Sequence, residues 1–145
     1  MSQEINTHFD IDFLDHVAIR VKDLELSAQW YSEVLGLKKM QLEHWGPFPI
    51  FMLAGKTGVA LFPSQEREIA SSQVTAKSCV DHFAFQVTAE NYNKAKAKFN
   101  NLRISFDEQD HHYFNSIYLR DPDEHTVELT TLVVEASPFY RGLIS

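Results

Sequence analysis

Two histidines and one glutamate have the residue types and positions best suited to binding a metal ion. His16 and His82 each follow an aspartate at the start of a predicted strand, and Glu128 lies in the middle of another. Because side chains alternate between the two faces of a strand, Glu128 lies on the face opposite Val127 and Leu129. A carboxylate there must be solvated, paired or metal-bound, because burying an unpaired charge is costly.

Two imidazoles and one carboxylate are the ligand set of many Fe(II) and Mn(II) sites, and three protein ligands can also hold Zn(II) with a position left open for substrate. A single histidine on a strand is more often a structural residue. Two histidines at equivalent positions, together with an inward glutamate, favour a metal site instead. We therefore expect His16, His82 and Glu128 to meet at one divalent ion if their strands share a concave face.

An internal repeat supports this grouping. Residues 81–87, Asp-His-Phe-Ala-Phe-Gln-Val, match residues 15–21, Asp-His-Val-Ala-Ile-Arg-Val, 66 positions earlier. Hydrophobic periodicity and turn residues then predict one helix and four strands in each half. The helices are expected over 23–36 and 90–102, and the strands over 13–21, 37–43, 48–54 and 58–62 in the first half and near 81–87, 104–106, 113–119 and 126–133 in the second.

The chain is read as one domain, 1–145. Module one covers 13–63, a polar connector 64–78, module two 79–134 and a C-terminal tail 135–145. The predicted class is α+β, with two βαβββ modules that form a U-shaped mixed sheet around the metal site.

Composition limits the kinds of partner. An apolar fraction of 44% predicts a globular protein, and a net charge of -7 without a basic stripe argues against nucleic acid and membrane surfaces. A small-molecule substrate is the better expectation. The single cysteine, Cys79, is expected to be buried, and the absence of an export signal or long apolar run predicts a cytoplasmic protein.

The sequence resembles the vicinal oxygen chelate superfamily, which includes glyoxalase I, extradiol dioxygenases, fosfomycin-resistance enzymes and bleomycin-resistance proteins. The similarity lies in the two Asp-His strand openings, in residues 30–37 and in the hairpin 118–129, Tyr-Leu-Arg-Asp-Pro-Asp-Glu-His-Thr-Val-Glu-Leu. It implies paired βαβββ modules around a divalent metal, commonly completed across a homodimer. By motif position, it assigns His16, His82 and Glu128 as the metal ligands.

Departures from the patterns of individual branches indicate which branches of the superfamily this chain fits. Ala60 stands where glyoxalase-type isomerases have a second carboxylate, and alanine neither binds metal nor moves a proton, so a standard glyoxalase I is disfavoured. Fosfomycin-resistance enzymes have a threonine two residues after the first histidine, where this chain has Ala18. Their Ser/Gly-rich potassium loop is replaced here by Asp-His-His-Tyr at 110–113.

The extradiol dioxygenase pattern fits better, although Gln109 and Glu124 depart from it. Its spacings are met by His111, Ile117, Tyr118, Asp121, Pro122 and Glu128. This resemblance favours Tyr118 or His111 as the group that donates or accepts a proton. Other histidines, including His125 in the turn, are expected to be solvated.

Three further residues are candidates for binding substrate. Arg120 could hold a carboxylate through its guanidinium group, and Phe51 and Phe62 could line a pocket for an aromatic ring, although a structural ion pair and ordinary core packing remain open alternatives. The leading prediction is a metal-dependent enzyme that acts on a small oxygen-chelating substrate, with dioxygenase-like chemistry slightly favoured. The alternatives are a glyoxalase-like lyase or isomerase, a fosfomycin-resistance-like transferase, and a metal-free protein that sequesters a drug or metabolite.

Overall fold

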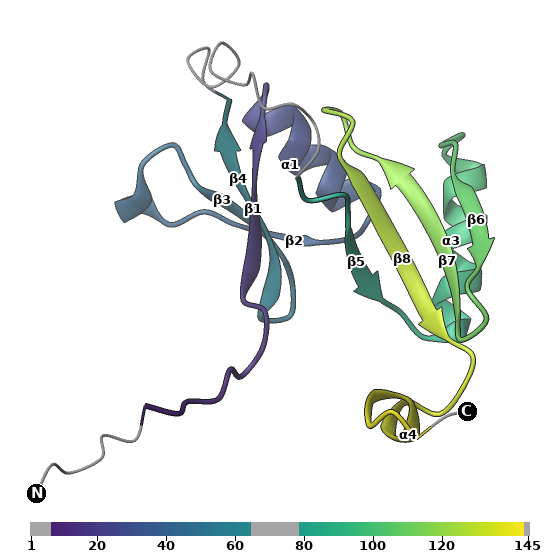
Figure 1. Ribbon diagram of the computed structural model, residues 1–145. Helices are drawn as coiled ribbons and strands as arrows, with labels where there is room; N and C mark the ends of the chain where they lie inside the picture. The colour runs from purple at the N-terminus through teal and green to yellow at the C-terminus, as the bar shows by residue number, and fades with distance from the viewer. Residues whose placement is uncertain (1–6, 65–78, 144–145) are drawn as a thin grey trace, which may run out of the picture.

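The computed structural model describes residues 7–64 and 79–143. The predicted α+β class with two βαβββ modules is confirmed, and each module forms its own four-stranded sheet (Figure 1). Most of the expected connector lies outside the described residues. Cys79, expected to be buried, is exposed, because it precedes the first strand of module two rather than lying within it.

Module one follows the predicted order of strand, helix and three strands. Its elements are β1 (His16–Val21), α1 (Leu24–Glu33), β2 (Lys38–Met40), the 3-10 turn η1 (Glu43–Trp45), β3 (Ile50–Ala54) and β4 (Thr57–Pro63). The strand order is β1-β4-β3-β2, with β1 parallel to β4 and the other pairs antiparallel. Asp23 begins the helix as expected, since its carboxylate accepts the Leu26 N–H at 3.1 Å.

Module two repeats this topology with the strand order β5-β8-β7-β6. Its elements are β5 (Phe83–Gln86), α3 (Ala89–Asn101), β6 (Asp107–Asp110), β7 (Phe114–Arg120) and β8 (Thr126–Leu132), followed by the short helix α4 (Ala136–Tyr140). The strand expected near 104–106 begins later, at Asp107. Ile104 and Phe106 instead pack against the core as the chain leaves α3, where Arg103 adopts a left-handed conformation with φ 57°.

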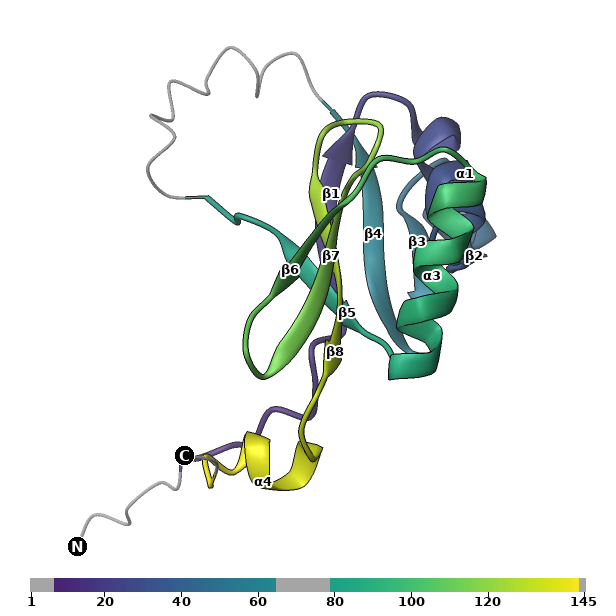
Figure 2. The ribbon, with the colours of Figure 1, turned by 90° about the vertical axis from the view of Figure 1, so that its right-hand side faces the viewer.

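The two helices cover the same side of the sheets (Figure 2). Tyr31 of α1 and Phe99 of α3 are almost fully buried beneath the strands. The two modules share this core, because Val127 of β8 belongs to the cluster around α1 and Phe85 packs against both clusters. Burial of the helix side leaves the opposite face of each sheet for function.

The alternation predicted for β1 is confirmed. His16, Ala18 and Arg20 are exposed, whereas Val17 and Ile19 on the other face are partly buried. Across the described residues, β1 pairs only with β4 and β5 only with β8, so a single U-shaped sheet is not formed within one chain. In the same part of the chain, none of the helices is long and apolar enough to cross a membrane.

Candidate metal centre

His82 and Glu128 form the centre of the candidate site. Glu128 lies in the middle of β8 opposite Ala84 of β5, and His82 immediately precedes β5. The Nε2 atom of His82 lies 2.9 Å from Oε2 of Glu128, whose side chain is 10% exposed. The carboxylate is therefore paired, as its burial requires.

His16 and His82 are each hydrogen-bonded to the aspartate that precedes them. Nδ1 of His82 lies 2.7 Å from the Asp81 carboxylate, and Nδ1 of His16 lies 2.7 Å from that of Asp15. A carboxylate that accepts the Nδ1–H proton orients the ring and leaves Nε2 to bind a metal, as is usual for histidine ligands. The hydrogen bond to Asp81, with the charge of Glu128, raises the pKa of His82.

The spacing of the pair suits a divalent ion. Two ligand atoms bound at about 2.1 Å and at right angles to one ion lie roughly 3 Å apart, and the observed separation of His82 Nε2 and Glu128 Oε2 is 2.9 Å. An imidazole nitrogen and a carboxylate oxygen are also the donor types that Fe(II), Mn(II) and Zn(II) accept. The residues present therefore fit such an ion as part of its ligand set.

His16 lies apart from this pair. It is on the open face of the other sheet, where its ring makes an edge contact with Phe51 at a centroid distance of 5.0 Å. Within residues 7–64 and 79–143, no three His, Cys, Asp or Glu side chains are grouped closely enough to hold one ion. One chain thus brings together two of the three predicted ligands.

The two predicted acid–base residues lie beside the buried carboxylate. Tyr118 is directly opposite Glu128 in the β7–β8 ladder. Its hydroxyl oxygen also lies 2.8 Å from Nε2 of His111. Burial and the charge of Glu128 raise the pKa of Tyr118. A hydrogen bond thus joins exposed His111 to Tyr118, which lies opposite Glu128.

The turn between β6 and β7 holds His111 in place. His112 has a positive φ of 70°, and its N–H donates to the Asp110 carboxylate at 2.8 Å. The His111 N–H donates to the Phe114 carbonyl at 2.8 Å. These bonds define the path of the turn and direct the His111 ring toward Tyr118.

The predicted substrate-binding residues divide between the modules. Arg120 and His82 both line a cavity of about 350 Å³. The guanidinium of Arg120 donates to the Glu124 carbonyl at 3.1 Å. Phe51 and Phe62 instead lie in module one. Phe51 contacts His16 and, at 5.1 Å between ring centroids, Trp45. This aromatic group lies next to the separated histidine.

The ladder registers explain the position of Ala60. Ala60 pairs with Ala18 and Phe51, just as Glu128 pairs with Ala84 and Tyr118. Ala60 therefore occupies the module-one equivalent of the glutamate position, as the repeat predicts. Phe51 likewise occupies the position of Tyr118, so module one has a histidine but neither the carboxylate nor the hydroxyl.

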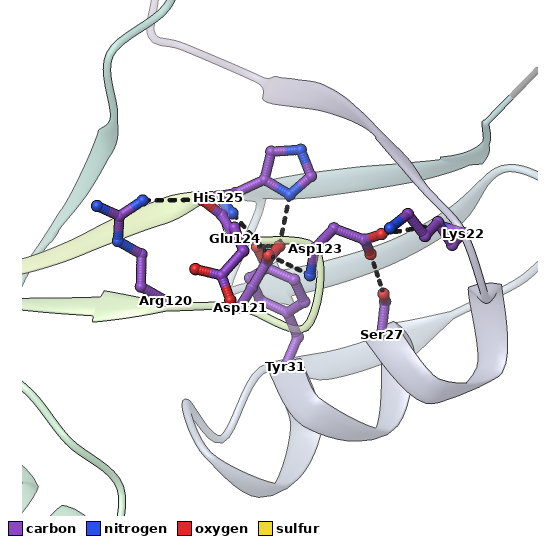
Figure 3. A network of polar contacts seen from close by, with 8 residues as sticks. All are labelled: Lys22, Ser27, Tyr31, Arg120, Asp121, Asp123, Glu124 and His125. Carbon is purple, nitrogen blue, oxygen red and sulfur yellow. Dashed lines mark hydrogen bonds and ion pairs between the residues drawn. The ribbon is translucent and has the colours of Figure 1, made fainter. Parts of the chain in front are cut away.

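A polar network at the β7–β8 turn was missed in the sequence (Figure 3). The Tyr31 hydroxyl donates to Asp121 Oδ2 at 2.8 Å, and Nδ1 of His125 lies 2.8 Å from the same oxygen. Asp121 also accepts the N–H groups of Asp123 and His125, each at 2.9 Å. The prediction that His125 is simply solvated is wrong, because its ring binds a buried carboxylate.

A second part of this network reaches the end of β1. Asp123 accepts the Lys22 N–H at 3.1 Å and the Ser27 hydroxyl at 3.3 Å (Figure 3). The Asp-Pro-Asp turn was visible in the sequence, and so was the apolar stripe that buries Tyr31. What could not be seen was that the turn of one module packs on the helix of the other.

Two named transferases are similar to this chain in sequence. The chain is 27% identical over 116 residues to glutathione transferase FosA of Serratia marcescens, covering 80% of this chain and 78% of that protein. It is 29% identical over 125 residues to metallothiol transferase FosB of Staphylococcus epidermidis, with 84% and 83% covered.

A solved structure shares the fold. The fosfomycin resistance protein FosX of Listeria monocytogenes superposes with a TM-score of 0.63 at 20% identity, over 86% of this chain and 97% of that one. The family model described as Glyoxalase/Bleomycin resistance protein/Dioxygenase superfamily matches residues 13–129. The chain therefore belongs to this superfamily, the vicinal oxygen chelate proteins.

Proposed function

We propose that the protein is a divalent-metal-dependent enzyme whose small substrate binds the ion through two neighbouring oxygen atoms. The observation that carries this proposal is the His82–Glu128 contact of 2.9 Å, with Asp81 bound to the other side of the imidazole ring. A buried carboxylate facing an oriented imidazole is the donor arrangement such an ion requires. We place the enzyme in the reducing cytosol, as the single cysteine, which cannot form an internal disulfide, suggests.

The third ligand in this proposal is His16 of a second copy, so that the working unit is a homodimer with two equivalent centres. Two features support this. His16 has the same aspartate-backed geometry as His82 but lies on the open face of the other sheet. The strands β1 and β5 are also at sheet edges, which a second copy can cover.

The proposed reaction is oxidative cleavage of an ortho-dihydroxylated aromatic ring. A bound Fe(II) or Mn(II) would supply open positions for both substrate oxygens and for O2. Tyr118 and His111 transfer the substrate proton, since they form a hydrogen-bonded pair beside Glu128. Phe51 and Phe62 provide apolar surface for the ring on the side of His16, and Arg120 can hold a substrate carboxylate.

A second candidate is transfer of a thiol to a small electrophile, as the names of FosA and FosB describe for those proteins. The sequence identities of 27% and 29% favour it. Ala18 argues against it, since the fosfomycin-resistance pattern has a hydroxyl at that position. Assays of metal-loaded protein with catechols under O2, and with fosfomycin plus glutathione or another thiol, separate the two. Product from the thiol reaction alone would replace the dioxygenase proposal.

Metal content tests the centre itself. We expect wild-type protein loaded with Fe(II), Mn(II) or Zn(II) to retain the ion through desalting, and Glu128→Ala to lose it while remaining folded by circular dichroism. Glu90→Ala is the matched control, because Glu90 is on α3 and pairs with Lys94 at 3.0 Å. Equal metal in the wild type and Glu128→Ala would disprove the centre. A wild type that takes up no ion would favour the metal-free sequestering protein.

A further inference from the structure

A polar cavity lies on the helix side of module two, away from the candidate metal centre. It has a volume of about 1060 Å³ and is lined by residues from the first half of α3, from β6 and from the ends of β7 and β8 nearest to them. Among the described residues, its lining includes neither the predicted metal ligands nor the predicted acid–base pair. The cavity is therefore separate from the site described above.

One row of side chains across the sheet forms the floor of this cavity. Thr131 of β8 pairs with Asn115 of β7, which in turn pairs with Asp110 of β6, and all three line the cavity. Because side chains alternate along a strand, Leu129 and Ile117 lie on the same face in the next row. Both of these are buried in the core. The sheet thus changes from apolar to polar within one row, underneath the same helix.

Thr131 is the buried member of this row. The residue is only 4% exposed, and the structure records no hydrogen bond between its hydroxyl and any other described residue. A buried hydroxyl without a partner destabilises a fold, because it has lost its hydrogen bonds to water. A ligand that enters the cavity can supply the missing partner.

The fold itself does not require a polar pair at this place. The threonine lies three residues after the glutamate of the metal centre, and the asparagine lies three residues before the tyrosine opposite that glutamate. The same steps from Ala60 and Phe51, their equivalents in module one, lead to Pro63 and Phe48. Both of these side chains are apolar. The polar row is therefore a feature of module two alone.

The charges around the cavity are unequal. Lys96 is its one lysine or arginine, whereas three carboxylates line it. The Lys96 ammonium already lies 2.8 Å from Oε2 of Glu108, which also accepts the Tyr92 hydroxyl at 2.8 Å. Asp110 and Glu135 remain, and neither forms an ion pair with another described residue; Asp110 accepts the uncharged N–H of His112. The cavity therefore favours a positively charged ligand.

We propose that this cavity binds a small polyhydroxylated amine, such as an amino sugar. The ligand hydroxyls would pair with Thr131 and Asn115, and its ammonium group would lie between Asp110 and Glu135. The volume of the cavity is near the upper end of the range of about 300–1,000 Å³ that is typical of small-molecule sites. The inference is independent of the metal chemistry proposed above.

An anionic ligand fits these residues less well. The excess of carboxylates would repel it, and the only ammonium group in the lining is already paired. The N-terminus of α3, which borders the cavity, carries Glu90 in its first turn. That side chain offsets the partial positive charge of the helix end.

The first experiment titrates the protein with glucosamine by calorimetry. We expect saturable binding of one glucosamine per chain. N-acetylglucosamine, which keeps most of the hydroxyls but has no positive charge, should bind at least about 10-fold more weakly. Equal binding of the two sugars would overturn the assignment of an amine. No saturable binding of glucosamine at millimolar concentrations would overturn the site.

The second experiment places glucosamine in the cavity by substitution. Thr131→Val keeps the side-chain volume but removes the hydroxyl, so it should weaken binding at least about 10-fold while urea unfolding shows no loss of stability. Asp110→Asn removes one charge and should also weaken binding. Asp107→Asn is the matched control, because Asp107 is on the same strand but does not line the cavity. Unchanged binding in Thr131→Val and Asp110→Asn, or an equal loss in Asp107→Asn, would overturn the proposal.

A third variant separates this cavity from the metal centre. Glu128→Ala should bind glucosamine with the affinity of the wild type, because Glu128 is on the opposite face of β8 from Thr131. Loss of glucosamine binding in Glu128→Ala would show that the sugar binds at the metal centre and would overturn this inference. Retained glucosamine binding in a wild type that takes up no metal would overturn the proposed function alone.

Discussion

Among single residues, Tyr118 links the exposed part of the site to its buried part. Its hydroxyl lies 2.8 Å from Nε2 of His111 at the protein surface, and the residue stands opposite buried Glu128 in the β7–β8 ladder. A phenol in this position can pass a proton to or from a substrate oxygen. In the proposed reaction, His111 would share that proton and, because it is exposed, would exchange it with solvent after each turnover.

We predict that Tyr118→Phe keeps the metal but loses most of the activity. The ligand pair His82 and Glu128 is untouched, whereas loss of a positioned acid–base group typically lowers the turnover number by about 10²- to 10⁴-fold. Steady-state kinetics on metal-loaded protein, with the metal quantified in parallel, checks this.

Tyr113→Phe is the control for Tyr118→Phe. Its ring packs against Phe139 rather than against the site, so activity should be retained. Full activity in Tyr118→Phe would show that the Tyr118 hydroxyl takes no part in the reaction.

The sequence predicted that His82 and Glu128 lie close together, because strand periodicity decides which side chains share a face, and the structure places them 2.9 Å apart. The prediction used an expected strand over 81–87, and the place of Ala60 followed from the repeat. The role of His125 did not follow. It depends on Tyr31, which is distant in sequence and reaches Asp121 only when the modules pack together.

At the level of elements, the β7–β8 turn is the principal polar contact between the modules. Its Asp121 is 3% exposed and accepts hydrogen bonds from a helix of module one and from its own turn. Glu128 and Tyr118 lie on the two strands that this turn joins. The orientation of this hairpin relative to α1 is therefore fixed by buried hydrogen bonds as well as by apolar packing.

We predict that Tyr31→Phe lowers the free energy of unfolding by about 2 kcal/mol, the typical cost of losing a hydrogen bond to a charged group. Asp121 keeps its other donors, so the fold should persist. Urea unfolding at neutral pH measures the change. Tyr140→Phe is the control, because Tyr140 is 64% exposed and its hydroxyl is hydrogen-bonded to Gln86. If Tyr140→Phe lowered the free energy of unfolding as much as Tyr31→Phe, the buried bond of Tyr31 would contribute no more than an exposed one.

The same variant should also change the response to alkaline pH. Burial and the nearby Asp121 carboxylate raise the pKa of Tyr31 in the folded chain. In the unfolded chain, tyrosine ionises near pH 10, so the stability conferred by this residue is present below pH 10 and declines above it, by about 1.4 kcal/mol per pH unit. Tyr31→Phe should show a shallower decline. Tyr92, whose pKa is also raised by burial, should still make the free energy of unfolding of this variant fall with rising pH.

Element boundaries were predicted less accurately than element types. The expected strands 37–43 and 48–54 shorten to Lys38–Met40 and Ile50–Ala54, with η1 between them. Periodicity locates apolar residues, but a strand ends where its ladder partners end, and β2 pairs with β3 over three residues only. Pairing is a property of two segments, so it cannot be deduced from either one alone.

At the scale of the whole molecule, the three predicted metal ligands are divided between the two modules. His82 and Glu128 belong to module two and His16 to module one, and within the described residues the two sheets do not pair with each other. Both modules could be predicted from the sequence, whereas the relation of one chain to the proposed second copy could not. That relation depends on surfaces of the chain that contact another molecule.

We predict that two inactive variants restore each other when mixed. His16→Ala and Glu128→Ala should each bind no metal as homodimers. In a mixed dimer, His16 of the Glu128→Ala chain meets His82 and Glu128 of the His16→Ala chain, so an equal mixture regains about one quarter of the wild-type metal. Metal analysis after unfolding and refolding the mixture checks this. A mixture that stays metal-free would place all three ligands of each centre within one chain.

The hydrogen bond from the Lys22 N–H to Asp123 connects the end of β1 to the turn that joins β7 and β8. In the proposed dimer, β1 supplies His16 to one centre, whereas this turn's hairpin supplies Glu128 to the other. Any displacement of the hairpin on binding would therefore be passed through the same chain to the opposite centre. The two centres are then energetically coupled, and successive ions are expected to bind with different affinities rather than independently.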